Sequence, residues 1–207
     1  ISFSAGNFNI SETITMGDGS TKIYAILFSG AGGIYQTILK LADSADCSMF
    51  RIGYDPRFVT SSSTAKGKAD WIDFRDITFD GNQANQTKHY YDITSADESD
   101  DAIVISGVDL SAIIKPHYPI RIYGSTNNDI TTIVKSITYS DPNTTIVTYD
   151  GVMTDSDDSA TEAGKLHFGW PLIDARYWQD GGMEHCFVEK SFGPGVYIAN
   201  AWTVIFD

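Results

Sequence analysis

The sequence contains little cysteine, few basic residues and no long apolar segment. Its 207 residues include two cysteines, Cys47 and Cys186, which are far apart and outside any Cys/His spacing typical of zinc. We therefore expect two free, buried thiols, no bound zinc and no disulfide framework. No apolar run reaches the length of a membrane-spanning helix, so membrane insertion is not expected.

Basic residues are scarce relative to acidic ones. Lys and Arg number 14 against 27 Asp and Glu, which gives a net charge of −13. Nucleic acids and anionic membranes attract clustered Lys and Arg, and the sequence has no such cluster, so nucleic acid is not an expected partner. The acidic surplus could supply carboxylates for sugar chemistry, although a solvated acidic surface is the simpler interpretation.

The residues that are abundant favour an all-β protein. The chain has 18 Gly, 11 Tyr and 11 Phe and is rich in Thr, Ile and Asp. β-branched and aromatic residues suit strands, whereas Gly, Asp, Asn and Ser suit the turns between strands. No part of the first eighty residues shows the 3.6-residue period of an amphipathic helix.

A loose repeat runs through the first eighty residues. Apolar strand residues stand just before turns at Phe3, Phe28, Ile52 and Phe79, at intervals of about 25 residues. Such spacing is typical of a solenoid, in which one coil cannot bury its inner face alone and successive coils stack. The strand-like runs at both ends of the chain lead us to expect a piece of a longer protein.

A different pattern occupies residues 96–170. Alternating strands separated by Asn, Asp, Gly and Pro turns indicate a small antiparallel β domain. Its clearest predicted strands are residues 119–123, 132–139 and 144–149. We predict this domain to be inserted into the solenoid, which would consist of residues 1–95 and 171–207.

Four segments resemble the pectate-lyase-like superfamily of right-handed parallel β-helices. They follow the order of that family's coils and cover about residues 1–92 and 178–207. The segments are Phe3–Ile14, Phe28–Gly33, Ile77–Asn82 and His185–Ile198. Proteins with this opening are best known among bacteriophage tailspikes and related polysaccharide depolymerases.

The inserted segment also resembles a β module of phage structural proteins. The similar stretches are residues 120–129, 134–139 and 145–147. The turn of that module often continues Asn-Asp-Gly-Thr-Tyr, whereas this chain runs Asn128-Asp-Ile-Thr-Thr132, which weakens the match.

The first resemblance implies a polysaccharide-binding protein of the virion tail or the extracellular space that assembles as a homotrimer. It leaves open whether the chain is a glycoside hydrolase, a polysaccharide lyase or no enzyme at all. Three interpretations therefore stand: a tailspike that depolymerises host surface polysaccharide, a secreted microbial lyase or hydrolase, and a non-catalytic β-helical stalk or adhesin. The phage-like insert favours the first and the third.

The strongest candidate site follows the predicted insert. Asp180 and Glu184 could be the two carboxylates that hydrolysis of a glycosidic bond requires. Aromatic side chains and a histidine surround them and could bind a sugar through its C–H face and its hydroxyls. These candidate sugar-binding residues are Trp170, Tyr177, Trp178 and His185. Packing between the two domains is the alternative interpretation of the cluster.

A third candidate catalytic residue, Asp80, alternates with Asp76 on one predicted strand, so both could face the same side. Asp80-Gly-Asn82 also has the chemistry of a turn, which favours a structural role. The acidic runs 97–101 and 155–158 could bind calcium through oxygen ligands, although neither has the spacing of an EF-hand. No other metal or cofactor is expected.

Overall fold

The structure is a computed structural model that describes residues 1–17, 23–33, 35–53, 69–97, 99–125, 129–149, 164–199 and 201–207. The described residues form strands and one short 3-10 helix, which confirms the prediction of an all-β protein. None of the helical structure in these ranges is long and apolar enough to cross a membrane. The chain divides into a first unit, Ile1–Thr87 with Trp170–Asp207, and a second unit, Lys88–Gly169.

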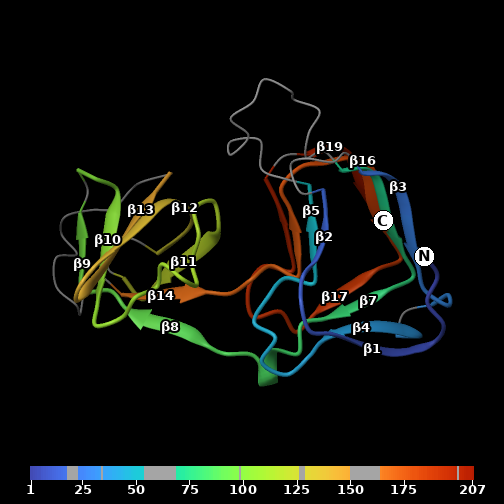
Figure 1. The fold of residues 1–207 in the computed structure, drawn as a ribbon, viewed down its shortest axis with the longest axis horizontal. Coiled ribbons are helices and arrows are strands. Elements are labelled where there is room, and N and C mark those ends of the chain that lie inside the picture. Colours follow the sequence, from blue (N-terminus) through green and yellow to red (C-terminus); the bar gives the residue numbers. More distant parts are fainter. Residues whose placement is uncertain are drawn as a thin grey trace. The chain divides into compact units, whose positions relative to one another are not determined.

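The first unit contains three four-stranded parallel sheets (Figure 1). Sheet 1 comprises β1 (Gly6–Ile10), β4 (Thr37–Leu41), β7 (Thr78–Asp80) and β17 (Phe187–Glu189). Sheet 2 comprises β2 (Ile14–Met16), β5 (Phe50–Ile52), β15 (Ile173–Ala175) and β18 (Val196–Ile198). Sheet 3 comprises β3 (Ile23–Ser29), β6 (Ala69–Arg75), β16 (Trp178–Glu184) and β19 (Ala201–Phe206).

The chain visits these sheets in a fixed cyclic order. It passes from sheet 1 to sheet 2 to sheet 3 and then returns to sheet 1, so that β1–β2–β3 is followed by β4–β5–β6. Each returning strand pairs in parallel with the strand of the preceding cycle. The second unit interrupts the third cycle, between β7 and β15, and β17–β18–β19 form the fourth.

The approximately 25-residue spacing seen in the sequence does not describe this register. Phe28 lies in sheet 3, Ile52 in sheet 2 and Phe79 in sheet 1, so these residues are not equivalent. The true partners are further apart, since Gly6 pairs with Thr37. All three residues precede turns because each strand of a cycle ends at a corner. An apolar residue followed by a turn therefore occurs several times in each cycle, and its spacing is shorter than the cycle.

Inward-facing aromatic rings fill the space between the three sheets. Phe28 and Phe74 occupy neighbouring strands and stack with their ring centroids 5.2 Å apart. Phe50 and Trp178 meet Phe74 edge-on, at 5.0 and 6.1 Å. Alternate residues of a regular strand point to opposite faces of its sheet, as in β4, where Thr37, Leu39 and Leu41 are buried and the residues between them are less so.

Both cysteines are free and half-buried, in the first unit. Removal from water raises the pKa of the Cys47 and Cys186 thiols. Less thiolate then exists at a given pH, so we expect iodoacetamide to label the native protein at about pH 7 at least about tenfold more slowly than the urea-unfolded protein. Mass spectrometry of the labelled protein measures this. Equal rates would contradict the burial of these thiols.

The same shift links the thiols to stability. The folded state favours the neutral thiol. The contribution of the two thiols to the free energy of unfolding is therefore fully present below the ordinary thiol pKa, and it is lost as the pH rises through the higher pKa of the folded state. Urea midpoints measured from neutral to alkaline pH should therefore decline more for the wild-type protein than for a Cys47→Ala, Cys186→Ala double variant.

The second unit is built on one seven-stranded antiparallel sheet with the order β8-β14-β11-β12-β13-β10-β9. Its strands are β8 (His89–Asp92), β9 (Ser95–Asp97), β10 (Ala102–Ser106), β11 (Pro119–Tyr123), β12 (Ile130–Ser140), β13 (Asn143–Thr148) and β14 (Lys165–Phe168). The strands predicted as a meander, β11, β12 and β13, are neighbours in this sheet. A register shift between Val134 and Ser136 interrupts the regular pairing of β12 with β13.

The first edge of this sheet begins earlier than the sequence indicated. The sequence pattern predicts that the inserted domain begins at about residue 96, yet β8 pairs with β14, from Phe168↔His89 to Lys165↔Asp92. The sequence pattern groups these four residues of β8 with the N-terminal part of the chain. The short 3-10 helix η2 (Gln83–Asn85) lies between β7 and β8.

Candidate functional site

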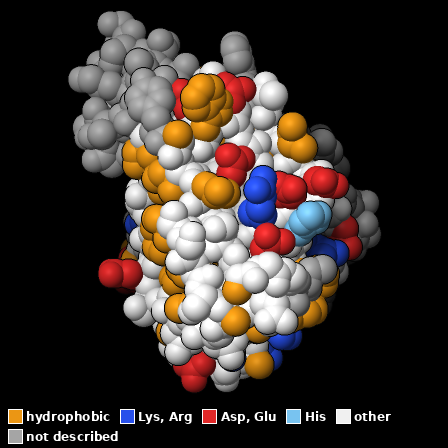
Figure 2. Space-filling model, turned by 90° about the vertical axis from the view of Figure 1, so that its right-hand side faces the viewer, with side chains coloured by type: hydrophobic (Ala, Val, Ile, Leu, Met, Phe, Trp, Pro, Cys, Tyr) orange, Lys and Arg blue, Asp and Glu red, His pale blue; other side chains and the backbone are white. Residues whose placement is uncertain are grey.

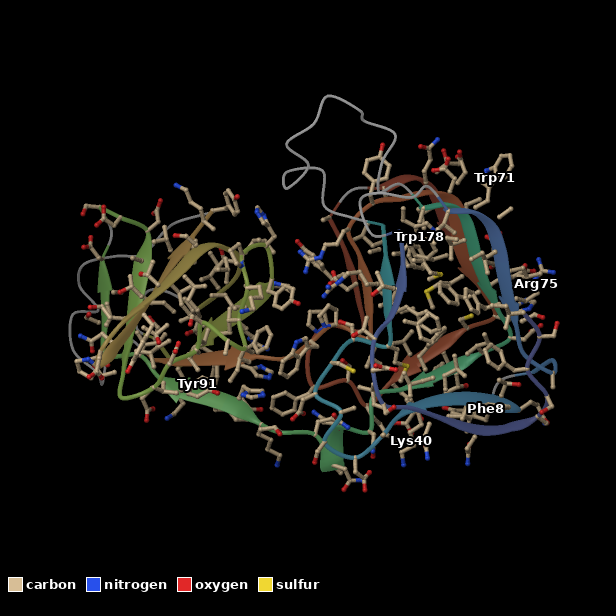
Figure 3. All side chains as sticks on the ribbon, in the orientation of Figure 1. Phe8, Lys40, Trp71, Arg75, Tyr91 and Trp178 are labelled. Carbon is tan, nitrogen blue, oxygen red and sulfur yellow. The ribbon has the colours of Figure 1, made fainter. Side chains whose placement is uncertain are left out.

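The outer face of sheet 3 carries charged and aromatic side chains. In β6, Ile72 and Phe74 are buried, whereas Trp71, Asp73 and Arg75 alternate with them and face outward. Figure 2 looks onto this side of the first unit and shows acidic side chains gathered near basic ones and a histidine. In Figure 3, Trp71 and Arg75 point away from the interior. Trp71 is 57% exposed.

Each strand of sheet 3 is bent at one residue whose backbone has a left-handed conformation. Ala25, Trp71, Asp180 and Thr203 have φ values of 52°, 54°, 49° and 51°, and the strand register aligns them side by side. A positive φ is costly for residues other than glycine, so the surrounding sheet must hold all four. The bend exposes Trp71 and brings Asp180 to the same outer face.

An open groove of about 390 Å³ lies on this face. Gly181 and Gly182 of β16 form part of its lining, and Gly182 pairs with Asp73 on one side and Ile205 on the other. A side chain would not fit at Gly182, because an added Cβ would lie 2.4 Å from the Ile205 carbonyl oxygen. At Gly181 an added Cβ would lie 2.4 Å from Nε1 of the buried Trp178, so both positions require glycine for close packing of β16 with its surroundings.

Carboxylates dominate the polar lining of this sheet 3 groove. Asp73, Asp180, Glu184 and Asp207 line it, and Arg75 is the one basic side chain among its described lining residues. Arg75 Nη2 lies 2.5 Å from Glu184 Oε2, and both side chains are about half exposed.

One further contact lies in the groove and another lies beside it. Gln179 Nε2 donates a hydrogen bond of 3.1 Å to Asp180 Oδ2. At the next corner of the chain, His185 Nδ1 lies 3.5 Å from Asp76 Oδ1. Asp180 and Glu184 are thus each held by a neighbour and remain half-buried, which leaves them accessible to a ligand.

Asp180 and Glu184, predicted as catalytic from the sequence, both line the groove. Trp178, predicted to bind sugar, is different. It is fully buried, packs against Phe74 and donates a hydrogen bond of 3.0 Å from Nε1 to the Ile72 carbonyl. Because Trp178 is an inward-facing residue of β16, it cannot offer a ring face to a ligand, and it packs in the core of the first unit.

The other three predicted sugar-binding residues lie at corners of the first unit. His185 follows β16 directly and is largely exposed beside Glu184. Tyr177 immediately precedes β16 and is half-buried against Gly53. Trp170 is half-buried at the point where the chain re-enters the first unit.

Asp80, the third predicted catalytic residue, lies in sheet 1 rather than at the groove. It is 7% exposed, accepts a hydrogen bond of 2.8 Å from the Asn82 backbone N–H, and lies 3.2 Å from Lys190 Nζ. Asn82 has a left-handed φ of 49° and donates from Nδ2 to Asp43 Oδ1 at 2.8 Å. Asp80 therefore organises a turn, as its Asp-Gly-Asn context indicated.

The acidic runs proposed to bind calcium are described only in part. Asp97 Oδ1 accepts hydrogen bonds from Ser99 N at 2.9 Å and Ser99 Oγ at 2.7 Å, and the Ser99 hydroxyl lowers the pKa of this exposed carboxyl. Residues 155–158 lie outside the described residues. Within the described ranges, no group of three or more His, Cys, Asp or Glu side chains is arranged to hold a metal ion.

Sequence reasoning missed the contribution of β6 to the groove. The segment Trp71–Phe74 was recognised as a strand, and its alternation of apolar with aromatic, acidic and basic residues already places Trp71, Asp73 and Arg75 on one face. What the sequence does not contain is the pairing of β6 with β16, which brings Arg75 opposite Glu184.

No protein-family model, no curated protein and no solved structure matches this chain.

Proposed function

We propose that this protein binds a polysaccharide chain in the sheet 3 groove and hydrolyses it, as a tailspike-type depolymerase would. The observation that carries the proposal is the combination of an exposed Trp71 ring with Asp180 and Glu184 around one open groove. Aromatic faces stack on the C–H face of a sugar, and a carboxylate pair is the machinery of glycoside hydrolysis.

The proposed scaffold is a right-handed parallel β-helix interrupted in its third coil. The cyclic order of the three sheets and the parallel pairing between successive cycles support this assignment. In such a scaffold, side chains from neighbouring coils form continuous surfaces along the stack. A linear polymer could therefore lie across Trp71 of β6, Asp180 of β16 and Thr203 of β19.

The acidity of the groove bears on the reaction. A lyase acts on a uronate and must offset the negative charge of its substrate, whereas this groove presents four carboxylates and a single arginine that is already beside Glu184. The lining therefore suits a neutral sugar segment and hydrolysis. In that reaction Glu184, held by Arg75, is the base or nucleophile, and Asp180 is the proton donor.

Incubation with panels of bacterial capsular polysaccharides and lipopolysaccharides tests this function. New reducing ends without ultraviolet absorbance from unsaturated uronates support hydrolysis, whereas that absorbance would identify a lyase. Binding without cleavage would support the second candidate, a non-catalytic adhesin. The mass of the assembly in solution tests the accompanying proposal of a homotrimer on a virion tail or in the extracellular space, and a monomer would count against it.

We expect Trp71→Ala to weaken binding of the cleaved polysaccharide by about tenfold, since the exposed indole would supply one stacking contact. Trp71 is largely exposed, so the change should leave the urea midpoint unaltered. The affinity is best measured with an uncleaved substrate on the Glu184→Gln background. The matched control is Tyr35→Ala, which removes another exposed aromatic ring, beside Phe187 of sheet 1. Equal losses in both variants would show that the ligand does not occupy the groove.

A further inference from the structure

The outward face of β8, β14 and β11 in the second unit carries two cross-strand rows of side chains. These three strands are consecutive in the sheet (Figure 1). The first row is Tyr90–His167–Arg121 and the second is Asp92–Lys165–Tyr123. Residues on the opposite face of the same strands, such as Leu166 and Phe168, are buried. We call the six residues of the two rows the aromatic strip.

The aromatic rings of the strip contact one another. The Tyr90 ring centroid lies 4.7 Å from that of His167 and 6.1 Å from that of Tyr123. Tyr90 nevertheless remains 46% exposed. The outer face of an antiparallel sheet is ordinarily covered by polar residues, so this group of contacting aromatic rings is a candidate contact surface for a ligand.

The charge of the strip is opposite to that of the protein. The whole chain has a net charge of −13, yet the strip has Arg121 and Lys165 against one carboxylate, Asp92. Lys165 Nζ donates to Asp92 Oδ1, and this contact raises the pKa of the exposed lysine. Asp92 is thus engaged by Lys165, whereas the exposed Arg121 side chain forms no ion pair with a described residue.

We propose that the aromatic strip is a second saccharide-binding site, specific for sugars that carry a carboxylate. The exposed part of the Tyr90 side chain can contact the sugar ring, and the phenol hydroxyls can bond to its hydroxyl groups. Arg121, one strand beyond His167, presents the planar fork that pairs with a carboxylate through two hydrogen bonds. A neutral sugar would leave the Arg121 charge unused, and a nucleic acid would need a broader basic surface than two rows provide.

Titration calorimetry of the full chain with an oligogalacturonate tests the proposal. The same oligomer with its carboxylates methyl-esterified is the matched neutral probe. We expect the acidic oligomer to bind, the ester to bind at least about tenfold more weakly, and the affinity for the acid to fall with added salt. Absence of binding by the acid, or equal binding of both probes, would overturn the proposal.

Variants locate the binding. Arg121→Gln and Tyr90→Ala should each lower the affinity about tenfold, whereas Lys135→Gln, which removes an exposed positive charge from β12 of the same sheet, should not. Trp71→Ala, in the sheet 3 groove, should also leave this affinity unchanged. Loss with Trp71→Ala but not with Tyr90→Ala would place the oligomer in the groove and refute a separate site. The outcome is independent of the proposed hydrolysis.

Discussion

Asp180→Asn and Glu184→Gln are each expected to slow polysaccharide cleavage by roughly 10²- to 10⁴-fold, the range for a lost acid or base. Each substitution replaces a carboxylate by an amide of nearly the same shape. Asp180 and Glu184 are half-buried on the outer face of sheet 3, away from the core, so folding should be preserved. Initial rates of reducing-end formation measure the effect.

Two controls separate chemistry from charge. Asp73→Asn also removes one carboxylate from the lining of the groove, and we expect its rate to change by less than about tenfold. Glu12→Gln removes an exposed carboxylate outside sheet 3 and should have no effect. Substantial cleavage by both the Asp180→Asn and Glu184→Gln variants would refute the assignment of the catalytic pair. If Asp73→Asn and Glu184→Gln lowered the cleavage rate equally, the loss would result from the removed negative charge and not from a lost proton transfer.

Asp174→Ala is expected to destabilise the first unit by about 3–5 kcal/mol, the usual consequence of removing one partner from a buried ion pair. Asp174 is fully buried in sheet 2, with Oδ1 2.5 Å from Arg176 Nε and Oδ2 3.1 Å from Arg51 Nε. Arg176 is itself only 5% exposed and lies over the Tyr197 ring. Without the carboxylate, its buried charge would lose an ion-pair partner.

Urea unfolding followed by tryptophan fluorescence measures this effect selectively. All four tryptophans, Trp71, Trp170, Trp178 and Trp202, belong to the first unit. The control is Glu189→Ala, which breaks the more exposed contact of Glu189 with Lys190 and should cost no more than about 1 kcal/mol. A loss for Asp174→Ala as small as that of the control would show that the buried network does not stabilise the unit.

Local patterns in the sequence were informative about single strands. The alternation of buried and exposed residues in β6 follows from the two-residue period of a strand, so the outward positions of Trp71, Asp73 and Arg75 could be read directly. The turn role of Asp80 was also indicated by its Asp-Gly-Asn context. Strict alternation would instead place Trp178 on the same face as Asp180 and Glu184, and only the left-handed bend at Asp180 turns Trp178 inward.

The alternation rule did not describe Asp174. It lies between the inward residues Ile173 and Ala175 and should face outward, yet it is as buried as they are. Its burial depends on Arg51 and Arg176, which contact it from a neighbouring strand and from the following corner. A local pattern reports which face a residue occupies and not whether another part of the chain covers that face.

The sequence by itself determined that the protein is all-β, where most strands run and that Asp180 and Glu184 are close together. Only the tertiary structure decided which strands pair, and with them the composition of the sheet 3 groove and of the aromatic strip. Strand pairing depends on hydrogen bonds and side-chain contacts between residues far apart in the chain, such as Arg75 with Glu184 and Tyr90 with His167. The loose intervals of about 25 residues did not contain that register, because the segments joining the strands vary in length from cycle to cycle.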